Sequence, residues 1–507
     1  MSGTNHYSLA RARRSLIHFG IGKGASAGFG LFALVLAVRL LPTTDYGIYV
    51  ALIAFLEIHY MVTGFGLSTV AQRYITEHRI KSHPAHFSRF VVRMVLLRLL
   101  YALLGAAALM LVAEPLLRLF AIDLARETQW LFGALLVFGS GTRYLDEVFP
   151  ALLLQAYTQA LLFMGNVLKV LILGSAAMLG LGFGVGELLL AELLISFLAL
   201  LGGLLLLWRY LAVDRNLASG ETTHENPLMW RVALRFYFVQ LLGQVYGPNA
   251  IKLLLSRFIG LAQTAAFGFY QALVDMIRNY LPAYLLATWV RPLMVSRYLA
   301  SRDLREVGMM ANLLFKLSLM GVAPFAAFFA IHGDAFSAWI SAGKYVEAGT
   351  VLTLLSLVLA LQSLHVVLGM IVTTVERPDA SIVATLACCI ALPLAAWLSQ
   401  SWGLAGVAAA MALAECQWIG IVWTLLARDG LRFSLDLHGV AKILAAGLIA
   451  AAGIRAISGP AGADWTTLIP LALAGLIVLG VTALLKPFRA DERELIGRLI
   501  PARFFIW

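Results

Sequence analysis

Charged side chains inside long apolar segments are the residues of this sequence whose types and spacing could do chemistry. A charge at membrane depth costs about 2.5–3.5 kcal/mol on insertion scales, so it tends to face a polar cavity or a partner. Seven basic residues occupy such positions: Lys23, Arg98, Arg143, Lys169, Lys252, Arg278 and Lys316. We therefore expect a cationic interior, which would suit an anionic substrate.

Five of these residues are predicted to line one aqueous cavity: Lys23, Lys169, Arg278, Arg143 and Lys316. The expectation is strongest for Lys23 and Lys169, because neither has an acid three or four positions away. Arg143 precedes Asp146 and Glu147 by three and four positions, and Arg278 follows Asp275 by three, so internal ion pairs are the alternative for both.

Snorkelling towards the membrane surface is the alternative for Arg98, Lys316 and Lys252. The glycines around Lys23 do not form a phosphate-binding Walker A loop, since Ile17 and Gly24 stand where that motif needs Gly and Ser or Thr. We read them as small residues that let helices pack closely.

Acidic and histidine side chains in the same segments could carry protons or ions. The candidates are Glu57, His59 and Asp275. A hydrogen-bonded interior histidine is the alternative for His59, and equally for His365. The three cysteines have no metal-binding spacing, so we expect no metal site and no cofactor.

The segments that carry these residues identify a polytopic membrane protein. Of 507 residues, 61% are hydrophobic and 13% charged, against roughly 45–50% apolar and about 25% charged in soluble domains. The apolar runs are continuous and lack strand-like alternation, so the predicted fold class is all-α with about fourteen transmembrane helices. Their expected limits are 17–41, 46–71, 88–113, 128–155, 158–180, 186–208, 231–256, 263–290, 307–331, 345–372, 378–398, 402–427, 439–457 and 465–486.

The distribution of basic residues predicts the orientation. With the N-terminus inside, 25 basic residues fall in inner segments and six in outer ones, which follows the positive-inside rule and places both termini in the cytoplasm. This asymmetry also explains the net charge of +11 without nucleic acid. No loop exceeds about 25 residues, which argues against an enzyme such as a membrane glycosyltransferase or ligase.

A weak internal repeat indicates two lobes. Residues 47–52 (Gly-Ile-Tyr-Val-Ala-Leu) and 268–273 (Gly-Phe-Tyr-Gln-Ala-Leu) each open a helix after an outer-end arginine, at an offset of 221 residues. Six spans separate them, so the repeat is parallel. We expect six-helix lobes at 1–212 and 213–428, then two extra helices and an interfacial tail at 429–507.

Motifs around both repeats resemble bacterial polysaccharide exporters. The first comprises residues 39–49, followed by Gly-Phe-Gly-Leu at 64–67 and Gln-Arg-Tyr at 72–74; the second comprises 256–260 and 268–270. They are similar to the O-antigen and exopolysaccharide (Wzx-type) flippases of the multidrug/oligosaccharidyl-lipid/polysaccharide (MOP) exporter superfamily. The resemblance implies two six-helix lobes around a cavity, in a bacterial inner membrane. It also implies a cargo: a glycan linked by pyrophosphate to a polyprenol lipid, flipped to the outer leaflet.

Alternatives to a flippase remain open at this point. A MATE-like drug/cation antiporter of the same superfamily would favour an acidic cavity, whereas basic residues predominate here. A non-transporting membrane component of a polysaccharide synthesis complex is a further alternative. A polysaccharide polymerase and glycosyltransferases are the expected protein partners of a flippase, besides membrane lipids.

Overall fold

The computed structural model describes residues 9–214, 228–301, 303–431, 433–459 and 462–499, and the regular secondary structure in these ranges is entirely helical. This confirms the all-α prediction. The chain forms two compact units, Met1–Ala265 and Ala266–Trp507. The lobes at 1–212 and 213–428 were expected from a repeat rather than from contacts, so they stay a prediction.

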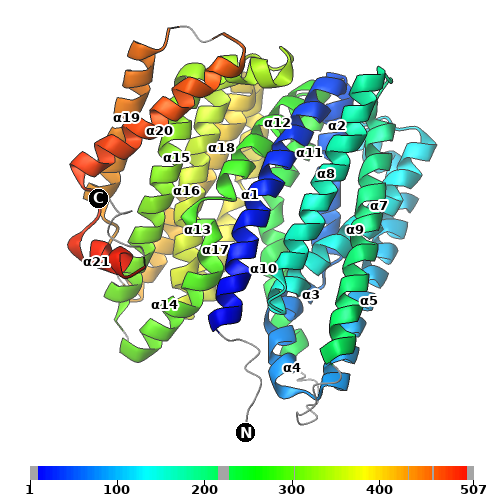
Figure 1. The fold of residues 1–507 in the computed structure, drawn as a ribbon, viewed down its shortest axis with the longest axis horizontal. Coiled ribbons are helices and arrows are strands. Elements are labelled where there is room, and N and C mark those ends of the chain that lie inside the picture. Colours follow the sequence, from blue (N-terminus) through cyan, green and yellow to red (C-terminus); the bar gives the residue numbers. More distant parts are fainter. Residues whose placement is uncertain (1–8, 215–227, 302, 432, 460–461, 500–507) are drawn as a thin grey trace. The chain divides into compact units, whose positions relative to one another are not determined.

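The first unit is a set of long helices packed in pairs (Figure 1). α1 packs on α8, α5 and α9 pack on α7, and α2 packs on α11. Their bounds are α1 (Leu9–Leu40), α2 (Thr43–Val62), α5 (Pro84–Leu111), α7 (Arg126–Ala151), α8 (Gln155–Leu179), α9 (Val185–Asp214), α10 (Leu228–Val245) and α11 (Pro248–Phe258). Pro248 at the start of α11 breaks the predicted seventh span into two helices, because proline lacks the N–H that a helix interior needs.

Short helical pieces and glycines shape the first unit between these helices. The predicted second span ends at Val62, and the chain continues through α3 (Leu67–Thr69), a π-helical turn (Val70–Tyr74), α4 (Ile75–Lys81) and, after α5, α6 (Ala113–Leu119). Position 47 requires glycine because the backbone of Leu261 lies against it. A Cβ at Gly47 would lie 2.1 Å from the carbonyl oxygen of Leu261. Gly22 likewise lets α1 approach α8, since its Cβ would lie 2.9 Å from the Cβ of Gln159.

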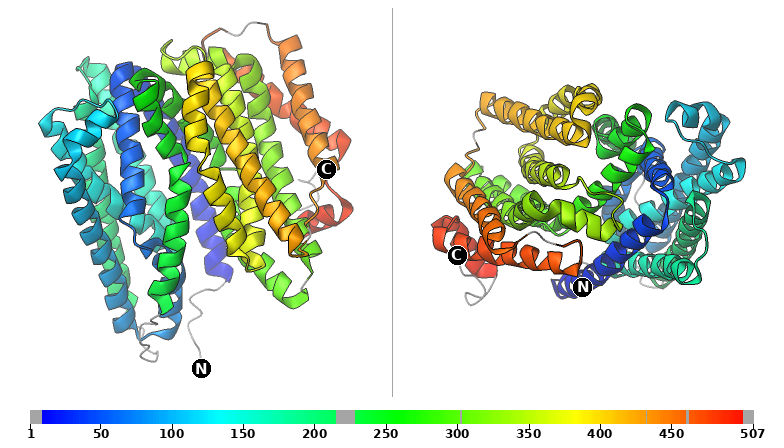
Figure 2. Two further views of the ribbon diagram at one scale, coloured as in Figure 1. Left: turned by 180° about the vertical axis from the view of Figure 1, so that it is seen from behind. Right: turned by 90° about the horizontal axis from the view of Figure 1, so that it is seen from above.

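The second unit is built around α15 and α16. α18 packs on α16 and α17, and α19 and α20 pack on α15 (Figures 1 and 2). The bounds are α12 (Leu261–Arg278, which begins in the first unit), α13 (Pro282–Leu285), α14 (Ala287–Ser301), α15 (Leu304–Ser341), α16 (Gly349–Thr374), α17 (Pro378–Cys388), α18 (Ala391–Arg428), α19 (Leu437–Ile457), α20 (Leu468–Leu485) and α21 (Ala490–Leu499). α15 extends to Ser341, beyond the expected end at 331.

Ten helical segments among the described residues are long and apolar enough to cross a membrane. One of them, Pro378–Arg428, is too long for a single crossing and covers two predicted spans. Its turn lies at Gly403, whose positive φ of 54° favours glycine. The other predicted spans coincide with α7, the pair α10 and α11, and α12 with α13, which are helical but carry charges or a break.

The C-terminal tail does more than lie along a membrane surface. Phe488 is buried against Leu313 of α15, and Leu495 of α21 packs on the same cluster. Residues 500–507 of the predicted interfacial tail lie outside the described residues. The described part of the tail is therefore docked onto the core of the second unit.

Candidate functional site

Lys169 belongs to a three-residue cluster in the first unit, which we call the lysine cluster (Lys169, Tyr49 and Glu192). The Lys169 Nζ forms an ion pair with Glu192 of α9 and donates to the Tyr49 hydroxyl at 3.0 Å. The Tyr49 hydroxyl donates to Glu192 Oε1 at 2.6 Å. The lysine and glutamate side chains are 19% and 17% exposed. Sequence spacing missed this acid because it lies on another helix.

Arg143 of α7 forms a second ion pair within the first unit. Its Nε and Nη2 both donate to Glu57 Oε1 of α2, the first at 3.0 Å. The predicted alternative, an ion pair with Asp146 or Glu147 on the same helix, is therefore wrong, because the partner is Glu57 on another helix. Glu57, predicted as an ion-coupling residue, is thus held by a guanidinium that stays charged at all physiological pH values.

His59 and Arg98 are interior residues of the first unit. The His59 Nδ1 lies 3.2 Å from the Ser140 hydroxyl, which fits the hydrogen-bonded alternative. Arg98 is 1% exposed, donates to the Tyr60 carbonyl oxygen at 2.9 Å, and lies 4.3 Å from the Tyr60 ring centroid. Snorkelling was therefore the wrong interpretation for Arg98, since the backbone carbonyl and the ring hold it inside.

Arg278 and Asp275 of α12 form the expected pair three positions apart, with 3.0 Å between Nη1 and Oδ1. The Gln271 side chain also donates to Asp275 Oδ1 at 3.0 Å. The Arg278 guanidinium lies 5.9 Å from the ring centroid of Tyr284 on α13. Arg278 and Asp275, predicted for cargo binding and for ion coupling, are thus each other's partners in the described state.

Lys316 lies in a buried cluster at the start of α19, which we call the tail cluster (Lys316, Asp436 and Glu492). Its side chain is 0% exposed, and Nζ donates to Asp436 Oδ2 at 2.7 Å, to Glu492 Oε2 at 2.5 Å and to the Pro487 carbonyl at 3.1 Å. An ammonium has three donors, so all are used. Neither cavity lining nor snorkelling describes this lysine, which ties the tail and α19 to α15.

Asp436 is the acid of the tail cluster that lies between α18 and α19, outside the membrane-spanning helices. Burial alone would disfavour its charge. Hydrogen bonds from Lys316 and from the Gly439 amide outweigh that effect and hold the pKa of Asp436 below its usual range. Asp436 also caps α19, since its side chain accepts from the Gly439 amide at 3.2 Å.

Lys23 is half-buried on α1, among the glycines that let α1 approach α8. Its role as a cargo-binding lysine stays a prediction. No group of three or more His, Cys, Asp and Glu side chains that could hold a metal ion occurs among the described residues.

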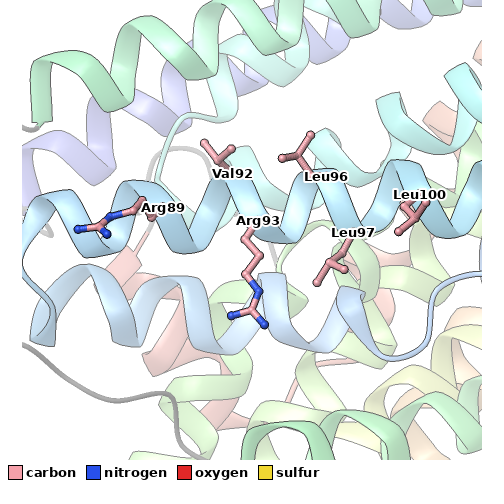
Figure 3. A pocket seen from close by; sticks show the side chains of 6 residues that line it. All are labelled: Arg89, Val92, Arg93, Leu96, Leu97 and Leu100. Atoms are coloured by element: carbon pink, nitrogen blue, oxygen red, sulfur yellow. The ribbon is translucent and has the colours of Figure 1, made fainter.

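Two surface cavities contain none of the predicted cargo residues. One, of about 510 Å³, lies beside the tail cluster and includes Asp303, Arg305 and Arg489 in its lining. The other, of about 370 Å³, is a groove on α5 with Arg89 and Arg93 at one end and leucines along the helix (Figure 3). Arginines at the end of an apolar helix are typical of the inner membrane surface.

Solved structures share this fold. The "Lipid II flippase MurJ, inward closed conformation" matches with a TM-score of 0.67 and 15% identity, over 95% of this chain and 100% of its own. An inward-facing "multidrug resistance MATE family transporter of the MOP superfamily" matches with a TM-score of 0.59 and 15% identity, over 82% and 98%. The "MATE multidrug transporter DinF-BH" matches with a TM-score of 0.59 and 17% identity, over 84% and 96%. The chain thus shares its overall fold with these three structures.

A comparison of the sequence with family models assigns the chain to one protein family. The profile of a family described as "Polysaccharide biosynthesis protein" matches residues 13–296, which is more than half of the chain. The chain belongs to this family and is a multi-pass membrane protein with a transporter fold. No curated protein matches its sequence.

Proposed function

We propose that the chain flips a polyprenyl-pyrophosphate-linked oligosaccharide from the inner to the outer leaflet of a bacterial inner membrane. The observation that carries this proposal is membership of the polysaccharide biosynthesis family over residues 13–296. The fold shared with a lipid II flippase supports movement of a lipid-linked cargo. Both termini would be cytoplasmic, and a polymerase and glycosyltransferases would act on the same cargo after and before it is flipped.

The cationic residues supply a recognition chemistry for the pyrophosphate. Lys23, Arg143, Lys169 and Arg278 are the proposed head-group residues. Three of them are paired with carboxylates in the described state, so the phosphates would replace those carboxylates as cargo enters. Such an exchange keeps each buried cation neutralised throughout, which avoids the cost of a bare charge at membrane depth. Lys316 is left out, because its three donors are used in the tail cluster.

Alternating access would move the head group and sugars, while the lipid tail stays in the bilayer. The predicted lobes would rock about the bound pyrophosphate, as in other transporters built from repeats. Because phosphate recognition depends on charge, the proposal predicts that a positive charge matters more than side-chain shape at Lys23.

Reconstituted flipping of a fluorescent polyprenyl-pyrophosphate oligosaccharide tests the proposal, with a membrane-impermeant reductant reporting the outer leaflet. We expect Lys23→Ala to lose most flipping and Lys23→Arg to retain much of it. Lys442→Ala is the matched control, because the hydrogen bond of Lys442 to the Lys486 carbonyl lies at the surface. Full flipping by Lys23→Ala would remove this residue from the mechanism. Export of a cationic dye without glycan flipping would contradict the proposed cargo.

A further inference from the structure

A histidine, a glutamate and a tryptophan form a compact cluster inside the second unit, which we call the His–Glu–Trp cluster (His365, Glu415 and Trp418). The His365 Nδ1 of α16 lies 2.8 Å from Glu415 Oε2 of α18. The His365 and Trp418 rings are stacked, with centroids 3.5 Å apart and planes at 7°. The Trp418 indole N–H is 3.4 Å from the Thr385 hydroxyl of α17, which anchors the ring.

The cluster lies well inside helices of membrane-spanning length. His365 is more than two turns from either end of α16, and Glu415 is near the middle of the part of α18 that follows Gly403. The Glu415 side chain is 11% exposed and that of His365 28%. A carboxylate at this depth requires a partner. The imidazole is thus partly exposed, whereas the carboxylate is nearly buried.

Other titratable groups near Glu415 are neutral at physiological pH. Tyr284 of α13, Cys388 of α17 and the adjacent Cys416 lie within its electrostatic reach. Tyrosine and cysteine ordinarily hold their protons near neutral pH. Beyond Tyr284, Arg278 and Asp275 neutralise each other.

Two further helices pack against α16, namely α14 and α15. Among their described side chains, none forms an ion pair with His365 or Glu415. Histidine is the side-chain type that ordinarily gains and loses a proton near neutral pH.

We propose that the His–Glu–Trp cluster is a proton-binding site that couples proton movement to transport; this rests on the proposed function. A proton taken from water gives an imidazolium held between the Glu415 carboxylate and the indole face, both of which stabilise a cation. The same proton returns to water when it leaves. Loss of the proton strands the carboxylate at membrane depth, so the protonation state biases which conformation is favoured.

This site differs from the coupling residues expected from the sequence. Glu57 and Asp275 face arginine, whose charge does not change at physiological pH. Glu415 faces a histidine, so among the ion pairs described above this one joins an intramembrane acid to an imidazole instead of to a permanent cation.

Tryptophan fluorescence of the full-length protein in lipid nanodiscs tests proton binding without cargo. A protonated imidazole quenches a stacked indole, so we expect a component of the tryptophan emission that changes with pH. The component should vanish in His365→Gln and in Trp418→Phe. His332→Gln is the matched control, because His332 of α15 bonds a hydroxyl, that of Ser458, at 2.8 Å. An unchanged pH response in His365→Gln would overturn the proposal.

Flipping in proteoliposomes with and without a pH gradient tests the coupling. We expect His365→Gln and Glu415→Gln to lose the response to the gradient while still moving cargo down its own gradient. Variants that keep the full response would overturn the coupling role. The two proposals fail separately: a titrating His365 with no glycan flipping contradicts only the cargo, whereas flipping without titration contradicts only the proton site.

Discussion

The lysine cluster of the first unit and the His–Glu–Trp cluster of the second are built from similar parts. Each holds a carboxylate on one helix beside a base on another, with an aromatic ring against the base. They differ in the base. Lysine stays charged at neutral pH, whereas histidine can lose its charge there. One buried acid is thus held permanently, and the other has a partner that can switch.

The aromatic ring also takes a different position in the two clusters. The Lys169 Nζ lies 5.3 Å from the Tyr49 ring centroid and also bonds the hydroxyl, so Tyr49 adds a hydrogen bond to both charges. Trp418 adds only a stacked face to His365. A hydrogen-bonded triad fixes its geometry, while a stacked face tolerates both charge states of the imidazole.

The largest expected effect follows from removing Lys316, the permanent cation of the tail cluster. Lys316→Met would leave Asp436 and Glu492, which are 7% and 1% exposed, without their buried cation. We expect the free energy of unfolding to fall by about 3–5 kcal/mol, as when one partner of a buried pair is removed. Denaturant unfolding in detergent measures this. Arg489→Met is the control, since that side chain is 52% exposed and should cost far less. Equal losses of unfolding free energy in Lys316→Met and Arg489→Met would contradict the assignment of Lys316 as the buried cation that stabilises both acids.

The lysine cluster should respond similarly but less strongly. Lys169→Met leaves Glu192 with only the Tyr49 hydroxyl, so we expect a loss of about 3 kcal/mol in the free energy of unfolding. The double variant Lys169→Met/Glu192→Met removes the stranded charge and should recover most of the loss. If the double variant is as unstable as the single one, packing rather than charge is what Lys169 provides.

The His–Glu–Trp cluster should tolerate loss of its base better. In His365→Gln, the amide can still donate to Glu415, so we expect the free energy of unfolding to fall by only about 1–2 kcal/mol. The measurement is the same denaturant unfolding, run beside Lys169→Met. A loss as large as that of Lys169→Met would erase the distinction between a permanent and a switchable partner.

The smallest expected effect is the acid response of the tail cluster. The pKa of Asp436 is lowered in the folded protein, because hydrogen bonds from Lys316 and Gly439 overcome the opposing effect of burial. Its contribution to stability is therefore complete above about pH 4 and is lost as the pH falls through its folded-state pKa. In Asp436→Asn, the loss of unfolding free energy on acidification should be smaller than in the wild type by no more than about 1 kcal/mol. Identical acid profiles for wild type and variant would contradict the assignment.

The helical architecture was largely readable from the sequence. Runs of about 20 apolar residues predict helices because a backbone in hydrocarbon must satisfy its own hydrogen bonds. The boundary expected between residues 398 and 402 lies beside the observed turn at Gly403. The break at Pro248 divides the seventh span, which was expected at 231–256, because proline lacks the N–H that a helix interior needs. The extension of α15 to Ser341 was missed, because a helix does not have to end where hydropathy falls.

The sequence by itself determined which buried residues carry charge, and that each needed a cavity or a partner. It also determined Arg278 with Asp275, because three positions along a helix bring side chains together. Only the tertiary structure decided the other partners. Glu192 with Lys169, Glu57 with Arg143, and Glu415 with His365 each lie on separate helices. Helix packing selects such pairs. The spacing of residues along one helix does not predict which faces of two helices will pack together.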